Sequence, residues 1–188
     1  QGDLKAALIQ KGMEIIETEG MSGLSLRKLA AHLGVSHSAP KNHFSTVRHL
    51  LTAIGAEGFH MFSSEMRAGL DERASRKDRL RAAMDGYVRF ARHHPELFRI
   101  MFAPEYTDLK DDTVRAAAAD SFQVLSQISC DLNWDKSNEP NAQQRTEVML
   151  WAFVLGYATL LISGQIADEA DPLHVSVHDA MPGFEYKP

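Results

Sequence analysis

Basic and imidazole side chains gather in one acid-free stretch of the chain, and such side chains can contact the phosphates and base edges of nucleic acid. There is no Asp or Glu between Gly20 and Ala56. The stretch holds the cations Arg27, Lys28, Lys41 and Arg48 and the histidines His32, His37, His43 and His49. Residues 1–50 carry six basic and four acidic side chains, a net charge of +2, which leaves −7 for the rest of a chain with a formal charge of −5. We therefore expect any affinity for DNA to come from this patch and to fall as salt rises.

The spacing of apolar residues in this stretch predicts two short helices around a tight turn. One face of the first helix is marked by Leu26, Leu29, Ala30 and Leu33, at three- and four-residue spacing. Gly34 can end that helix in a left-handed conformation. Ser36 can then open the next helix by accepting a hydrogen bond from a free backbone N–H group. Such a pair of helices is a helix-turn-helix, whose second helix enters the major groove of DNA.

This geometry selects the side chains that would meet DNA. The first residues of the reading helix point at base edges, which makes candidates of His37, Ser38, Lys41 and Asn42. Ser36, at the start of that helix, is a further DNA-binding candidate. Ser25 and Arg27 begin the preceding helix, where backbone N–H groups and a cation can hold a phosphate. Pro40 lacks an N–H group, so we expect an irregular first turn or a later start of the regular reading helix.

With its flanking residues, this segment resembles the tetracycline-repressor-like (TetR) family over about residues 4–55. The resemblance rests on the helix end at Glu19-Gly20, the runs Leu24–Ala30 and Leu33–Ser36, and the pairs His43-Phe44 and Leu50-Leu51. It implies that His43 touches the DNA backbone. The family usually has Tyr in place of Lys41 and Lys in place of Val47, so this chain gains one candidate phosphate contact and loses another.

The resemblance also implies an all-α fold with two functional domains. We expect a three-helix DNA-binding domain over residues 1–46, a helical ligand-binding and dimerisation domain over 47–167, and an irregular tail over 168–188. The most apolar stretch, Val148 to Ile162, is fifteen residues long, shorter than the roughly twenty needed to cross a bilayer. We therefore expect no membrane partner, and a helix that is covered on all sides, in part by a second copy of the chain.

In the family, the last two long helices of each subunit form a four-helix bundle, which implies pairing through residues 112–131 and 141–167. Such a homodimer would present two reading helices to a palindromic operator with half-sites about 34–36 Å apart.

A ligand pocket is expected among the middle helices. Its lining would be Met84, Tyr87, Phe98, Phe102, Phe122 and Trp151. Taken singly, each of these residues is better explained as core filling, but as a group they suit a hydrophobic or aromatic small molecule. Such a ligand can bind better when the two reading helices are held at a separation that does not fit DNA. By linkage, DNA binding is then weakened by the same coupling free energy by which DNA weakens ligand binding. The connecting helix, over residues 47–69, would transmit the change.

Catalytic, metal and cofactor chemistry has little support in the sequence. Glu57 and His60 form one Glu-x-x-His motif, whereas a di-iron bundle needs two such motifs and two further Glu. His174 and His178 lie in a proline-flanked, non-periodic segment, which does not favour a helical metal site. The single Cys130 and the absence of a secretion-like segment favour the cytoplasm.

Two classes of protein remain from the sequence. The first is a ligand-responsive DNA-binding regulator, a repressor released from its operator by a small hydrophobic molecule. The second is an all-helical small-molecule-binding or enzymatic bundle whose N-terminal segment is only structural. The first class is not enzymatic and needs no cofactor.

Overall fold

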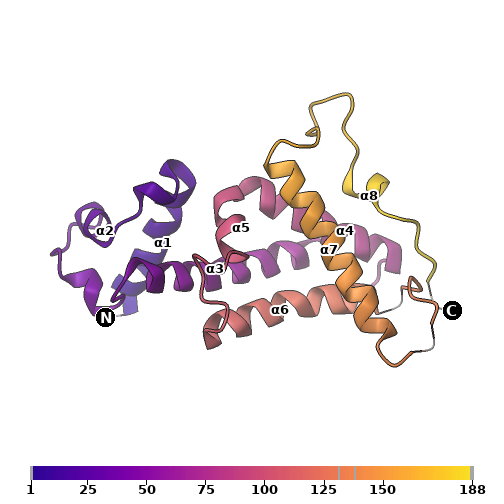
Figure 1. Cartoon of the computed structure of the whole chain (residues 1–188), viewed down its shortest axis with the longest axis horizontal. Helices are drawn as coiled ribbons and strands as arrows, with labels where there is room; N and C mark the ends of the chain where they lie inside the picture. Colours follow the sequence, from indigo (N-terminus) through magenta and orange to yellow (C-terminus); the bar gives the residue numbers. More distant parts are fainter. Residues whose placement is uncertain (1, 131, 138, 187–188) are drawn as a thin grey trace. The chain divides into compact units, whose positions relative to one another are not determined.

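The computed structural model describes residues 2–130, 132–137 and 139–186, and these are helical apart from loops and one isolated β-bridge between Leu132 and Tyr186 (Figure 1). The α-helices are α1 (Gly2–Glu19), α2 (Leu26–His32), α3 (Val47–Ala68), α4 (Arg76–His93), α5 (Pro95–Met101), α6 (Asp112–Ser129), α7 (Ala142–Ile162) and α8 (Val177–Ala180). Two short 3-10 helices, η1 (Met21–Gly23) and η2 (Ala39–Asn42), complete the set. The predicted all-α class is confirmed.

The chain divides into two compact units. One contains the residues up to His60 together with 94–119, and the other contains 61–93 together with the residues from Asp120 onward. Helices α3 and α6 therefore each contribute to both units. The predicted boundaries at residues 46 and 167 concern function and stay a prediction. Gln1 and residues 187–188, which belong to the predicted first domain and tail, lie outside the described residues.

In the first unit, α1 packs against α2 and α5. The interior of the unit is apolar, because each helix turns one apolar face inward. Its fully buried side chains include those of Leu8, Ile16, Leu29, Leu50 and Ile54. A Cβ atom at Gly58 of α3 would lie 2.7 Å from Sδ of Met101, so the absence of a side chain there lets α3 approach α5.

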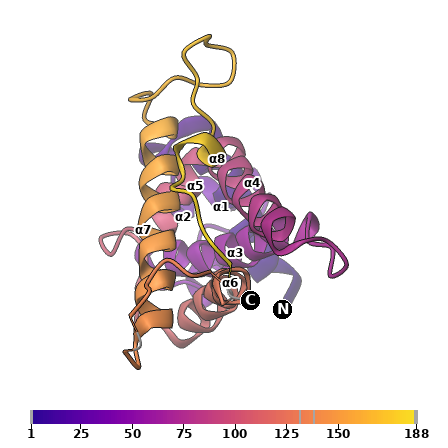
Figure 2. The same cartoon turned by 90° about the vertical axis from the view of Figure 1, so that its right-hand side faces the viewer.

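In the second unit, α4 lies against α7 and α8, and Figure 2 shows α8 beside both. The ring of Phe62 on α3 is 4.6 Å from the ring of Tyr87 and 5.2 Å from that of Phe90, which joins α3 to α4. A Cβ atom at Gly86 would lie 2.4 Å from the carbonyl oxygen of Glu65, so the backbones of α3 and α4 meet at this glycine.

Two predicted bundle helices end differently in the structure. The helix expected over 141–167 stops at Ile162, because Gly164 adopts a positive φ of 70° and its N–H group donates back to the carbonyl of Leu161. The helix expected over 112–131 is described to Ser129, and its expected end at Asp131 lies outside the described residues.

The tail, expected to be irregular over 168–188, contains a short helix, α8, within its described residues. Helix α8 forms there because Oγ of Ser176 accepts a hydrogen bond of 3.1 Å from the N–H group of Asp179.

Candidate functional site

Helix α2 is anchored by its apolar face and capped at its start. Leu29 and Ala30 are fully buried, while Ser25 and Arg27 are exposed. The backbone of Ser25 is extended, and its Oγ accepts a hydrogen bond of 3.1 Å from the N–H group of Lys28. The structure thus places Ser25 and Arg27 together on the outer surface at the start of α2, as expected.

The turn after α2 follows the prediction made from its glycine. Gly34 has a φ of 65°, the left-handed conformation that a side chain disfavours. The N–H group of Val35 then donates to the carbonyl of Ala30 at 3.0 Å, which closes the end of the helix. This turn directs the chain toward the segment that begins at Ser36.

The expected second α-helix is a shorter 3-10 helix, η2, and Pro40 explains the difference. In an α-helix the N–H group of residue 40 would donate to the carbonyl of Ser36, but proline has none. That carbonyl instead accepts from the N–H group of Ala39 at 3.0 Å, one residue earlier. The predicted capping role of Ser36 is wrong, because its Oγ lies 3.3 Å from Oγ of Ser38 and η2 begins after Ser38.

The polar side chains of this segment nevertheless face solvent. Pro40 is buried and Phe44 is only 3% exposed, so the two anchor the segment to the first unit. The exposed side chains are those of Ser36, His37, Ser38, Lys41 and Asn42, and His43 is half-buried. The structure therefore brings all the predicted DNA-contacting residues of this segment to one short stretch of surface.

The four cations of the acid-free stretch have different surroundings. Lys28 forms an ion pair with Glu19 of α1, which holds the pKa of that carboxyl below its usual range. Arg48 donates hydrogen bonds to the carbonyls of Glu105 at 3.0 Å and Pro104 at 3.2 Å. Within the described residues, Arg27 and Lys41 form no ion pair. These two cations are therefore available to a partner outside the chain.

Glu17 on α1 was missed in the sequence. Its Oε1 accepts a hydrogen bond of 3.1 Å from the N–H group of Leu97 in the first turn of α5. Burial raises the pKa of Glu17, and this hydrogen bond and the nearby His94 oppose the rise. The proline at the start of α5 indicates a helix with free N–H groups, but no local pattern indicates that an acceptor comes from α1.

The residues expected to line a ligand pocket are divided between the two units. In the second unit, Met84 is fully buried and Tyr87 is 3% exposed, and burial raises the pKa of Tyr87 well above its usual range. Phe122 and Trp151 are about two-fifths exposed, with ring centroids 6.0 Å apart. In the first unit, Phe98 is 2% exposed.

The ring of Phe98 lies 5.1 Å from that of Phe102. A joint ligand-binding role for the six predicted residues stays a prediction.

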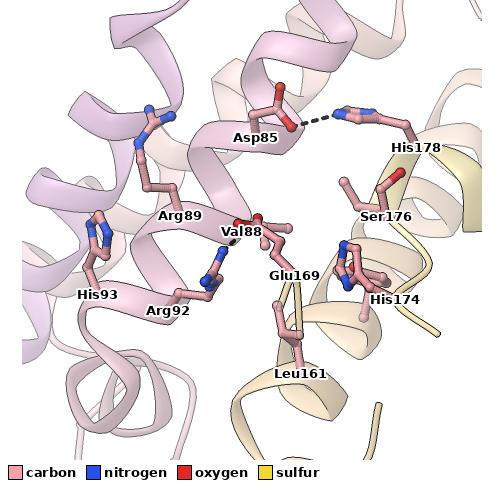
Figure 3. A pocket seen from close by; sticks show the side chains of 12 residues that line it. Asp85, Val88, Arg89, Arg92, His93, Leu161, Glu169, His174, Ser176 and His178 are labelled. Atoms are coloured by element: carbon pink, nitrogen blue, oxygen red, sulfur yellow. Dashed lines mark hydrogen bonds and ion pairs between the residues drawn. The ribbon is translucent and has the colours of Figure 1, made fainter. Parts of the chain in front are cut away.

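A cavity of about 520 Å³ lies elsewhere in the second unit, between α4, α7 and the segment after Asp168 (Figure 3). None of the six predicted pocket residues lines it. Its walls carry charged groups, including Arg92 paired with Glu169 at 2.6 Å and His178 paired with Asp85 at 2.6 Å. Sequence periodicity could not indicate this cavity, because one wall comes from the non-periodic tail.

Comparisons with known proteins agree with this arrangement. A family model described as Tetracyclin repressor-like, C-terminal domain, matches residues 80–181. The chain belongs to the TetR family of transcriptional regulators. The match lies outside the N-terminal segment that carried the resemblance, so two separate parts of this TetR-family chain lead to the same family. A comparison with curated proteins found no match.

Solved structures with the same fold include a protein of unknown function from Rhodococcus sp. RHA1. It is 28% identical, with a TM-score of 0.74 over 90% of this chain and 87% of that chain. A regulatory protein of the tetR family from Rhodococcus RHA1 is 19% identical, with a TM-score of 0.58 over 85% of this chain and 83% of that one. BioQ, solved with its natural double-stranded DNA operator, is 15% identical, with a TM-score of 0.54 over 86% and 87% of the two chains.

Family membership confirms that this chain is a transcription factor and not an enzyme. Members of the family are generally ligand-responsive, DNA-binding repressors, and they are soluble and typically cytoplasmic. Helix α7 is long and apolar enough to span a membrane by length and composition, but core helices of soluble proteins pass the same test.

Proposed function

We propose that this TetR-family protein is a homodimeric repressor that binds a palindromic operator and leaves it when a small molecule binds the helical region. The observation that carries the proposal is the surface formed by α2, the Gly34 turn and η2. It is polar and cationic outside, apolar and anchored inside, and free of acidic residues. The complex of BioQ with its operator supports DNA as the partner of this surface.

The contacts follow from the positions of the side chains on this surface. Lys41 and Arg27 hold phosphates, and Ser25 places the free N–H groups at the start of α2 toward the DNA backbone. His37, Ser38 and Asn42 meet base edges, where an Asn side chain can pair with adenine. Ser36 and His43 flank them at the edge of the surface.

The outward face of α7 supports dimerisation. Val148 is 57% exposed, Trp151 39% and Leu160 39%, although all are apolar and lie on one helix. Phe122 of α6, 38% exposed, continues this face beside Trp151. A second copy of the chain covers the α7 face by presenting the same face in return.

Binding to DNA in solution tests the proposal. Fluorescence anisotropy with fragments from the region upstream of the protein's own gene should find one that binds with a Kd on the order of 10⁻⁸ M or tighter. The logarithm of the affinity should fall linearly with the logarithm of salt concentration. Absence of binding to every fragment at low salt would favour a helical bundle with a structural N-terminal segment.

A further inference from the structure

The cavity between α4, α7 and the tail has a pattern of charge and apolar surface that the proposed function does not use. Arg89 and Arg92 both line the cavity from α4, three residues apart, but Arg92 points toward the tail whereas Arg89 points away from it (Figure 3). Val88 of α4, Leu161 of α7 and Val177 of α8 form apolar wall beside them. A cationic end next to an apolar wall is complementary to a molecule that has an anionic head and a hydrocarbon body.

The two arginines are held differently. Nε of Arg89 donates to Oε2 of Glu65 on α3 at 2.9 Å, which fixes its guanidinium from outside the cavity lining. Arg92 instead pairs with Glu169, whose side chain is 65% exposed and belongs to the tail. A carboxylate of the chain itself therefore lies against Arg92 from within the cavity lining. Because exposed ion pairs are weak, an outside carboxylate can replace Glu169 at little cost.

Other polar groups of the cavity lining pair with partners other than Arg92. His178 and Asp85 pair with each other, and the Tyr157 hydroxyl donates to the carbonyl of Val175 at 2.9 Å. Nδ1 of His174 lies 2.9 Å from the carbonyl oxygen of Ala167, so this nitrogen carries the proton. The contacts of His178 with Asp85 and of Tyr157 with Val175 hold the tail across the cavity. Its volume of about 520 Å³ lies in the usual range for small-molecule sites.

We propose that this cavity binds a small organic acid whose carboxylate replaces Glu169 on Arg92 and whose hydrocarbon body lies along Val88, Leu161 and Val177. Glu169 is then a built-in competitor that occupies the site in the free protein. The proposal names the class of molecule to which the repressor responds. It rests on the proposed function only for its effect on DNA, because binding itself is measured without DNA.

Isothermal titration calorimetry of the full chain with hexanoate, octanoate and 3-phenylpropionate tests the site. Each acid is compared with its primary amide, which has the same shape without the charge. At least one acid should bind with a Kd below about 1 mM and at least tenfold more tightly than its amide. Equal affinity for acid and amide, or no binding by any of the three acids, overturns the proposal.

Two substitutions separate an anion site from a simple clamp on the tail, because both remove the same ion pair. Arg92→Gln removes the site and should weaken binding of the acid at least tenfold. Glu169→Gln removes the competitor and should strengthen binding severalfold. If the ion pair only clamps the tail and has no binding role, both variants should change the affinity for the acid in the same direction. That result overturns the proposal. Arg81→Gln, on the same helix, exposed and outside the cavity lining, is the matched control and should leave affinity unchanged.

The effect on DNA is measured separately with the operator fragment. If the acid binds but operator affinity does not change, the acid-binding site is supported and the release of the repressor by this ligand is contradicted. If the protein binds no DNA, the repressor function fails while the acid-binding result keeps its meaning.

Discussion

The cationic side chains near the amino end differ in what the rest of the chain does with their charge. Glu19 neutralises Lys28, and the carbonyls of Pro104 and Glu105 hold Arg48. Lys41 is exposed on η2, directly after the buried Pro40. A lysine in this position acts as a point charge that can follow a phosphate without reading a base.

Replacing Lys41 by Ala should therefore weaken DNA binding about equally for all sequences. The slope of log affinity against log salt should decrease in magnitude by about 1.8, because the homodimer loses one phosphate contact of about 0.9 at each of its two half-sites. Fluorescence anisotropy between low and moderate salt measures both quantities. Lys77→Ala, which removes an exposed lysine of α4, serves as the control. A loss confined to one base position would assign Lys41 to base recognition instead.

At the scale of elements, much of the fold could be predicted because helices repeat their apolar residues. The end of α1 at Glu19, the long α3 and the short α5 after His94 follow from spacing, glycine and proline. The 3-10 form of η2 could be predicted only in part, since Pro40 indicates an irregular turn but not its length.

The end of α7 was missed although Gly164 marks it, because the apolar and small residues up to Ala167 continue a helical pattern. The exposed DNA-facing residues could be predicted from their position in the motif. The cavity and the role of Glu17 could not, since both join segments that are distant in the sequence and carry no local pattern.

The contact between α1 and α5 gives a prediction with a pH dependence. Burial raises the pKa of Glu17, so the folded chain holds this proton to higher pH than the unfolded chain does. The stability from this group is present below the ordinary pKa of 4.5 and is lost as pH rises through the raised value. Glu17→Gln removes this loss, so the variant should gain stability relative to the parent chain as pH rises from about 4.5 to 7.

Urea unfolding at several pH values measures this difference. Compared with Glu17→Gln, which keeps an acceptor, Glu17→Leu removes the acceptor for the N–H group of Leu97 and should cost about 1–3 kcal/mol at every pH. Glu14→Gln on the same helix is the control. The bond from Lys11 lowers the pKa of Glu14, so this variant should lose stability relative to the parent chain as pH rises. Parallel pH profiles for Glu17→Gln and the parent chain would show that the raised pKa of Glu17 does not affect stability.

For the whole molecule, the central question is what covers the apolar face of α7. Other residues of this helix, among them Leu150, Val154 and Ala158, are fully buried in the second unit. The outward residues Val148, Trp151 and Leu160 remain exposed in a single chain. A two-fold dimer through this face also gives a physical reason for a palindromic operator, because two identical surfaces then meet two identical half-sites.

Val148→Glu places a carboxylate on this face. Because Val148 is 57% exposed in the single chain, the fold should tolerate the change, while an unpaired carboxylate buried in the subunit contact should separate the subunits. Light scattering after size-exclusion chromatography should show a dimer for the parent chain and a monomer for the variant. Operator affinity should fall at least about a hundredfold, since one half-site contact replaces two. Leu109→Glu, an equivalent change at a residue 40% exposed in the first unit, should remain dimeric. A dimeric Val148→Glu protein with full operator affinity would place the subunit contact on another surface and leave the α7 face to a different partner.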